Sequence, residues 1–157
     1  MPSGPTLTFA GNGYNFTASG QTFVGVLSVN GTNALTVNLP TESLNFGNFG
    51  GSPFAFGANF FFDDGLGGID ASSSGLIQVS NGIDPDVFQA VTAPTNLSTF
   101  FGFISTLGPV TSITFSKTAG SGYVNVDNVV VGNVPEPSSV TLLGVGLAAL
   151  AVYRKGR

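Results

Sequence analysis

Aspartate side chains carry most of the chemistry that this chain could perform, and three of them surround a glycine-rich stretch. Asp63 and Asp64 precede the glycines, and Asp70 follows them. Carboxylate oxygens on flexible loops are typical ligands of Ca²⁺. The spacing differs from that of an EF-hand, which alternates its ligands and closes with a glutamate. Two interpretations stay open: a solvated turn, or a loop whose three carboxylates contribute to a calcium site.

Residue types that commonly catalyse reactions are scarce. The chain has no histidine and no cysteine, which excludes thiolate or imidazole metal sites and makes a nucleophilic triad hard to build. Paired carboxylates can hydrolyse glycosides. Asp84 and Asp86, two positions apart in the sequence, are the candidate pair in this chain. They flank Pro85, however, and an Asp-Pro-Asp run is typical of a turn. We therefore expect a protein that is not an enzyme and has no cofactor other than a structural calcium ion.

The composition indicates a folded β domain rather than a disordered or nucleic-acid-binding chain. Charged residues make up 8% of the sequence, and there are 15 phenylalanines. Such a chain has apolar area to bury, and its aromatic and β-branched residues suit a pleated sheet. Residues 1–134 contain one basic side chain, Lys117, against seven acidic ones. An acidic body lacks the positive surface that nucleic acids require, so we expect no nucleic-acid partner.

Short strand-like segments separated by turn residues extend to about residue 131. The clearest alternation lies in residues 53–62, where phenylalanines repeat on one face and predict a central core strand. Asn30 and Gly31 begin a four-residue hairpin loop. The fold predicted is all-β, a jelly-roll-like β-sandwich of about eight or nine antiparallel strands, with a partly open barrel as the alternative. The predicted strands are residues 6–10, 21–29, 34–39, 53–62, 75–80, 86–91, 97–105, 110–116 and 122–131.

The last part of the chain has a different composition. Residues 133–139 form a proline-containing spacer, residues 140–153 carry no charge, and residues 154–157 include three basic side chains. As a helix, the uncharged segment would span about 21 Å of the roughly 30 Å hydrocarbon core, and the spacer with snorkelling basic side chains narrows that gap. We predict a C-terminal transmembrane helix over residues 140–153. The alternative is a C-terminal core helix of the domain.

Three basic side chains act in this prediction as the membrane stop: Arg154, Lys155 and Arg157. They should remain cytoplasmic under the positive-inside rule, which places the β domain, residues 1–132, on the far side of the membrane. The first residues show no secretory signal peptide. Since the C-terminal segment requires export, we expect the export signal to be missing from this sequence.

Pro135, Glu136 and Pro137, followed by a short apolar segment and a basic end, resemble the PEP-CTERM sorting signal. The resemblance covers residues 134–157. It implies recognition by an exosortase, a membrane transpeptidase-like enzyme of Gram-negative bacteria, which would cut near the tripeptide. The body would then pass to the cell envelope or the extracellular polymer, and the tripeptide would be a substrate rather than a catalytic group.

The body is also similar to β-sandwich domains that often precede this signal, in residues 100–103, 109–115 and 126–132. In addition, Val124, Val126 and Asp127 resemble a pattern in the last strand of jelly-roll carbohydrate-binding modules. There, an aspartate can hold a structural calcium ion. By this analogy Asp127 joins Asp63, Asp64 and Asp70 as a candidate calcium ligand. The alternative is a solvent-facing aspartate near the end of the sheet.

These features together lead to a functional hypothesis. We expect a structural or adhesive protein of the cell surface or extracellular matrix of a biofilm, in contact with exopolysaccharide and sorted by an exosortase. Its precursor would sit in the inner membrane with a cytoplasmic C-terminus. The alternatives are a calcium-stabilised carbohydrate-binding module acting on exopolysaccharide, and a hydrolase with paired carboxylates.

Overall fold

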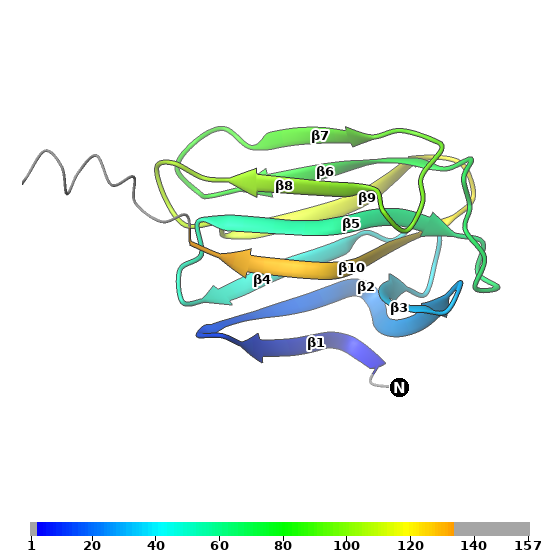
Figure 1. Cartoon of the computed structure of the whole chain (residues 1–157), viewed down its shortest axis with the longest axis horizontal. Coiled ribbons are helices and arrows are strands. Elements are labelled where there is room, and N and C mark those ends of the chain that lie inside the picture. Colours follow the sequence, from blue (N-terminus) through cyan, green and yellow to red (C-terminus); the bar gives the residue numbers. More distant parts are fainter. Residues whose placement is uncertain (1–2, 134–157) are drawn as a thin grey trace, which may run out of the picture.

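The computed structural model describes residues 3–133 and contains ten strands in this range (Figure 1). All the strand pairs are antiparallel. The strands are β1 (Ser3–Gly11), β2 (Tyr14–Val29), β3 (Thr32–Val37), β4 (Leu44–Gly50), β5 (Ala55–Asp63), β6 (Ser74–Ser80), β7 (Val87–Val91), β8 (Phe100–Ile104), β9 (Ser112–Ala119) and β10 (Tyr123–Gly132).

Nine of these strands form one continuous path that folds back on itself as two layers. The order is β7-β6-β9-β4-β2-β3-β10-β5-β8, and β1 pairs with β2 outside this path. The long strand β2 connects the layers, because Asn15–Ser19 pairs with β4 while Val24–Val29 pairs with β3. In Figure 1, β8, β5 and β10 lie in front of β6, β9 and β4. The arrangement is a β-sandwich built from a curled antiparallel sheet.

The two layers meet through phenylalanine rings. Phe60 of β5 contacts Phe115 of β9 with ring centroids 5.3 Å apart, and Phe56 of β5 contacts Phe46 of β4 at 5.4 Å. Neither β9 nor β4 is hydrogen-bonded to β5, so these contacts cross the interior between the layers. The alternation of residues along β5 explains this, because Phe56, Phe60 and Phe62 share the face that packs into the main core.

The opposite face of the front layer is also covered. Phe61 is fully buried there in a second, smaller cluster with Val29 and Ala34, against which Ile69 and Leu97 pack. The loops before β6 and before β8 supply these last two residues. Because both faces of β5 are buried, polar residues on its outer face are removed from water as well. This second burial determines the environment of the candidate site.

The all-β antiparallel fold predicted from the sequence is confirmed, with differences in detail. Strand β2 begins at Tyr14, seven residues before the predicted strand 21–29. The structure has one strand that the sequence pattern did not predict, β4, whose asparagines and glycines disfavour a strand assignment. The hairpin between β2 and β3 turns on two residues, Asn30 and Gly31, which both have positive φ, rather than on four.

The predicted transmembrane helix lies outside the residues that the structure describes. Within residues 3–133, no helix has the length and apolar character needed to cross a membrane.

Candidate functional site

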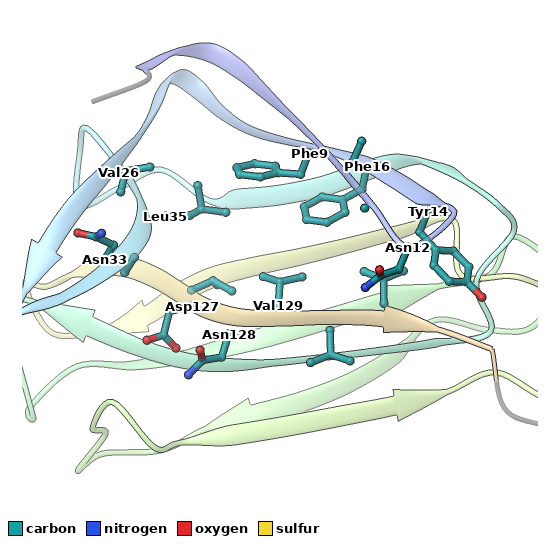
Figure 2. A pocket seen from close by; sticks show the side chains of 16 residues that line it. Phe9, Asn12, Tyr14, Phe16, Val26, Asn33, Leu35, Asp127, Asn128 and Val129 are labelled. Carbon is teal, nitrogen blue, oxygen red and sulfur yellow. The ribbon is translucent and has the colours of Figure 1, made fainter.

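A groove of about 590 Å³ lies where the sandwich opens between β1 and β10. Figure 2 shows Phe9 and Phe16 on one side of it and Asp127, Asn128 and Val129 of β10 on the other. The first two rings stack with centroids 5.1 Å apart. The groove exists because β3 is short and pairs with β10 only at Asn125 and Val126. Beyond that point, none of the strands in residues 3–133 pairs with β10 on this side.

Asp127 is the most unusual polar residue at this groove. Its side chain is only 6% exposed, and neither carboxylate oxygen has a hydrogen-bond partner within residues 3–133. Burial raises the pKa of Asp127, and the side chain of Asn59 partly opposes this effect. Asn59 is the direct cross-strand neighbour on β5. The sequence-based alternative of a solvent-facing aspartate is therefore wrong, because the outer face of β10 is covered at this position.

Asp63 lies on β5 four residues after Asn59, and neighbouring groups donate hydrogen bonds to both of its carboxylate oxygens. It is completely buried and accepts hydrogen bonds from the backbone N–H of Gly65 and from the side-chain amide of Asn125. The hydroxyl of Thr36 lies 3.5 Å from the same carboxylate. The register places Asp63 opposite Tyr123 and Asn59 opposite Asp127. Asp63 is thus hydrogen-bonded to Asn125, whereas Asp127 shares none of these hydrogen bonds.

The other two loop carboxylates stabilise the turn that carries them. Asp64 accepts hydrogen bonds from the backbone N–H groups of Leu66 at 2.8 Å and Gly68 at 2.9 Å, and these lower its pKa. Asp70 accepts hydrogen bonds from the hydroxyls of Ser72 and Ser73, and these lower its pKa as well. Both carboxylates therefore accept hydrogen bonds from the loop that carries them.

The four predicted calcium ligands do not form one carboxylate cluster. Among residues 3–133, no three acidic side chains are close enough to hold a metal ion together. Asp64 and Asp70 line a shallow depression next to Tyr123, whereas Asp127 lines the groove beside β1. A cation at Asp127 would need amide or backbone oxygens as its other ligands.

Asp84 and Asp86, the pair considered for glycoside hydrolysis, have separate partners. Asp84 accepts a hydrogen bond from the side chain of Asn81 at 2.8 Å, and Asp86 accepts one from Gln78 at 2.6 Å. The hydrogen bond from Gln78 lowers the pKa of Asp86. Asn81 also orders its own turn through the backbone N–H of Ile83 and Asp84. The observed contacts are those of a turn.

Several groove residues had no signal in the sequence analysis. Phe9 falls in the predicted strand 6–10, Tyr14 and Phe16 fall in none of the predicted strands, and Asn12 belongs to a turn. The pair Asn12–Gly13 has positive φ at both positions and is a hairpin signal that could have been found. That β10 would face this hairpin could not have been inferred, because the pairing of β10 depends on contacts between distant parts of the chain.

The predicted sorting residues Pro135, Glu136 and Pro137 and the predicted membrane-stop residues Arg154, Lys155 and Arg157 lie outside the described residues. A comparison with protein families includes all of them except Arg157. A family model described as a PEP-CTERM protein-sorting motif matches residues 133–155. The chain carries a PEP-CTERM sorting motif. This motif begins directly after β10, which ends at Gly132.

No curated protein matches the chain. Two of the solved structures that match it are carbohydrate-binding modules: CsCBM6-3 from Clostridium stercorarium in complex with cellobiose, and a family 6 module whose binding sub-sites were dissected by crystallography and calorimetry. Each shares 17% identity with this chain, covers 71% of it and 82% of its own length, and has a TM-score of 0.37. At this similarity, neither the ligands nor the binding residues of those modules transfer to the PEP-CTERM chain.

Proposed function

We propose that this chain is an exported structural or adhesive protein whose PEP-CTERM motif delivers the β domain to the cell surface or extracellular matrix through an exosortase. The matched motif, at residues 133–155, carries this proposal. In the precursor, residues 140–153 span the inner membrane and Arg154, Lys155 and Arg157 stay in the cytoplasm. The domain itself serves as cargo and requires no catalytic group.

The way the domain ends supports this division. The backbone N–H of Phe54 donates to the carbonyl of Gly132 at 3.0 Å and to the side chain of Asn133 at 3.2 Å. Gly132 and Asn133, the last two residues that the structure describes, are thus hydrogen-bonded to the domain. A cut near residues 135–137 would fall after them and would leave every strand of the sandwich in place. The sorting signal can therefore be removed without disturbing the domain.

The mass of the mature protein from producing cells tests this proposal. We expect a product that ends near residues 134–137 and is found in the envelope or outside the cell. Replacing Pro135, Glu136 and Pro137 with alanine should leave the full-length chain in the inner membrane. The matched control replaces Ser138 and Ser139 with alanine and should be processed normally. A wild-type chain that keeps Arg157 would show a plain membrane anchor and would refute sorting.

A second candidate function, carbohydrate binding, is favoured by the composition of the groove. Aromatic rings from Phe9, Tyr14 and Phe16 lie there with the amides of Asn12 and Asn33. Apolar rings and hydrogen-bonding amides together are what a sugar, with its apolar faces and hydroxyl groups, can use. In this role, the delivered domain would hold exopolysaccharide at the cell surface.

Glycan-array binding of the full chain tests the second function. Tyr14→Ala should weaken binding by up to about tenfold, because the variant removes one ring from the groove. Tyr123→Ala is the matched control, since Tyr123 lines the depression beside Asp64 and Asp70 instead. Equal losses in both variants, or no glycan bound by the wild type, would contradict a sugar site in this groove.

A further inference from the structure

Large apolar side chains are exposed together at one end of the sandwich. They belong to the loop between β6 and β7, the start of β7, the end of β8 and the loop after it, and each is between 56% and 66% exposed: Ile83, Val87, Ile104 and Leu107. Val87, Ile104 and Leu107 line one groove of about 550 Å³. Scattered apolar residues are ordinary on a protein surface, but a contiguous patch marks an interaction site. These four residues form the end patch.

Contacts between the two loops hold the end patch together. Ile83 lies against the loop after β8, because a Cβ atom built on Gly108 would be 2.5 Å from the Cδ1 atom of Ile83. The side-chain amide of Asn81 donates to the hydroxyl of Ser105 at 3.0 Å. The two loops therefore present their apolar side chains as one surface.

The described part of the chain ends beside the end patch. Gly132, the last residue of β10, pairs with Ala55 of β5, and Ala55 pairs with Ile104 of β8. Two strand spacings therefore separate Gly132 from Ile104, about 10 Å. The backbone of Phe54 joins the same two regions, because its N–H donates to the carbonyl of Gly132 at 3.0 Å and its carbonyl accepts from the N–H of Ser105 at 2.8 Å. Figure 1 shows the arrowheads of β8 and β10 at this end, together with the start of β7.

The length of the spacer brings this end of the domain close to the membrane. In the proposed precursor, residues 134–139 separate the domain from the apolar segment 140–153, and these six residues reach at most roughly 20 Å. The end patch therefore lies on the end of the domain nearest to the lipid. We propose that the end patch docks on the surface of the phospholipid bilayer, with its aliphatic side chains in the headgroup region. This inference rests on the membrane-anchored precursor of the proposed function and adds the surface through which the domain contacts the bilayer.

The charges at this end select the kind of lipid surface. Asp84 also lines the groove, and Asp86 directly precedes Val87. Lys117, the one basic residue in residues 3–133, pairs with Gly75 at the start of β6, whereas the end patch adjoins the end of β6. Binding to anionic lipids depends on clusters of basic residues. The end patch therefore matches a zwitterionic bilayer, which it binds through apolar contact.

Leu66, at the opposite end of the sandwich, provides a matched control. It is 93% exposed and lies in the loop after β5. Strand β5 runs antiparallel to β10 and ends at Asp63, which pairs with Tyr123 at the start of β10. The loop that contains Leu66 is therefore at the end of the domain away from Gly132. A label at Leu66 reports general contact with vesicles, whereas a label at Leu107 reports docking.

Lipid quenching of single fluorescent labels tests the docking. The chain has no cysteine, so each variant carries one labelled site: Leu107→Cys, Leu66→Cys or Ala149→Cys. The full-length chain is reconstituted in phosphatidylcholine vesicles that contain lipids spin-labelled at the headgroup or in the acyl chain. Headgroup spin labels should quench Leu107→Cys at least about threefold more than Leu66→Cys, because the end patch enters the headgroup region. Ala149→Cys, in the predicted transmembrane segment, reports anchoring and should be quenched by the acyl-chain label.

The three sites separate failure of the docking from failure of the proposed anchoring. If Ala149→Cys is quenched but Leu107→Cys is quenched no more than Leu66→Cys, the docking is refuted and the anchored precursor stands. If Ala149→Cys is not quenched, the anchoring is refuted, and the docking with it. A label at Leu107→Cys that is shielded from dissolved iodide but not quenched by lipid would assign the end patch to a contact between two copies of the chain and would also refute the docking.

A second site and a second lipid complete the experiment. Ile83→Cys is also in the end patch and should be quenched as strongly as Leu107→Cys, which keeps the test valid if the latter variant does not fold. Replacing part of the phosphatidylcholine with anionic phosphatidylglycerol should not increase quenching at either site. An increase of about threefold would show that charge, rather than apolar contact, holds the domain to the lipid and would overturn the proposal.

Discussion

Asp70 completes a chain of hydrogen bonds that connects the glycine-rich loop to the start of β10. The backbone N–H of Gly122 donates to the Ser73 hydroxyl at 2.9 Å, and that hydroxyl donates to Asp70 at 2.6 Å. Ser73 is completely buried. The bonds from Ser72 and Ser73 favour the ionised carboxylate, which is why the pKa of Asp70 lies below its ordinary value of 3.8.

The lowered pKa of Asp70 predicts a pH-dependent contribution to stability. The stabilisation is present above the ordinary pKa of 3.8 and is lost as the pH falls through the lower pKa of the folded state. Asp70→Asn should therefore lower the free energy of unfolding by about 1 kcal/mol at pH 7. Urea unfolding at pH 7 and near pH 3 measures the difference, which should shrink at the lower pH.

Asp84→Asn provides the control for this measurement. Asp84 is exposed, and its carboxylate accepts a hydrogen bond from the side chain of Asn81 on the same turn. Its substitution should change stability less than Asp70→Asn at pH 7. A difference between Asp70→Asn and the wild type that is equally large at both pH values would show that the ionised form of Asp70 is not what stabilises the loop.

At the scale of single elements, β6 shows how closely the two layers pack. A Cβ atom at Gly75 would lie 2.5 Å from the backbone oxygen of Ser116 and 2.8 and 2.9 Å from the rings of Phe62 and Phe115. The backbone of β6 itself therefore fills the space between these rings. No larger residue fits at Gly75 unless β9 or the rings move.

The packing at Gly75 leads to a prediction about the sandwich. Gly75→Ala should lower the free energy of unfolding by about 2 kcal/mol, as overpacking a filled core does. The matched control is Gly47→Ala in β4, where the nearest atom, the carbonyl oxygen of Thr111, is 3.9 Å from the added Cβ. Urea unfolding of both variants provides the comparison. Equal stability of the two would show that the layers are less tightly packed than the structure indicates.

Elements differ in how well their local sequence predicts them. Strand β5 was predictable because phenylalanines alternate along it, and all four of its phenylalanines are buried. Strand β4 was not, since residues such as Asn45, Gly47 and Asn48 favour turns. It forms because β2 and β9 pair with it on both sides and Phe46 packs into the core. Tertiary pairing here outweighs local propensity.

At the scale of the whole molecule, the chain divides into a domain and a signal with opposite properties. The domain is acidic and nearly free of basic side chains, and its last strand ends at Gly132. The sorting motif begins at residue 133, and the basic side chains are gathered in the last four residues. A chain arranged in this order can be held at a membrane through one end and released by a single cut between the two parts.

The sequence alone determined the sorting motif, the all-β class and the outline of most strands. Each of these depends on neighbouring residues: the order of Pro135, Glu136 and Pro137 before an apolar segment, and the two-residue alternation of strands. Only the tertiary structure decided that β10 pairs with β5, that the outer face at Asp127 is covered, and that Asp63 is hydrogen-bonded to Asn125. These properties arise from contacts between residues more than 60 positions apart, which local patterns do not encode.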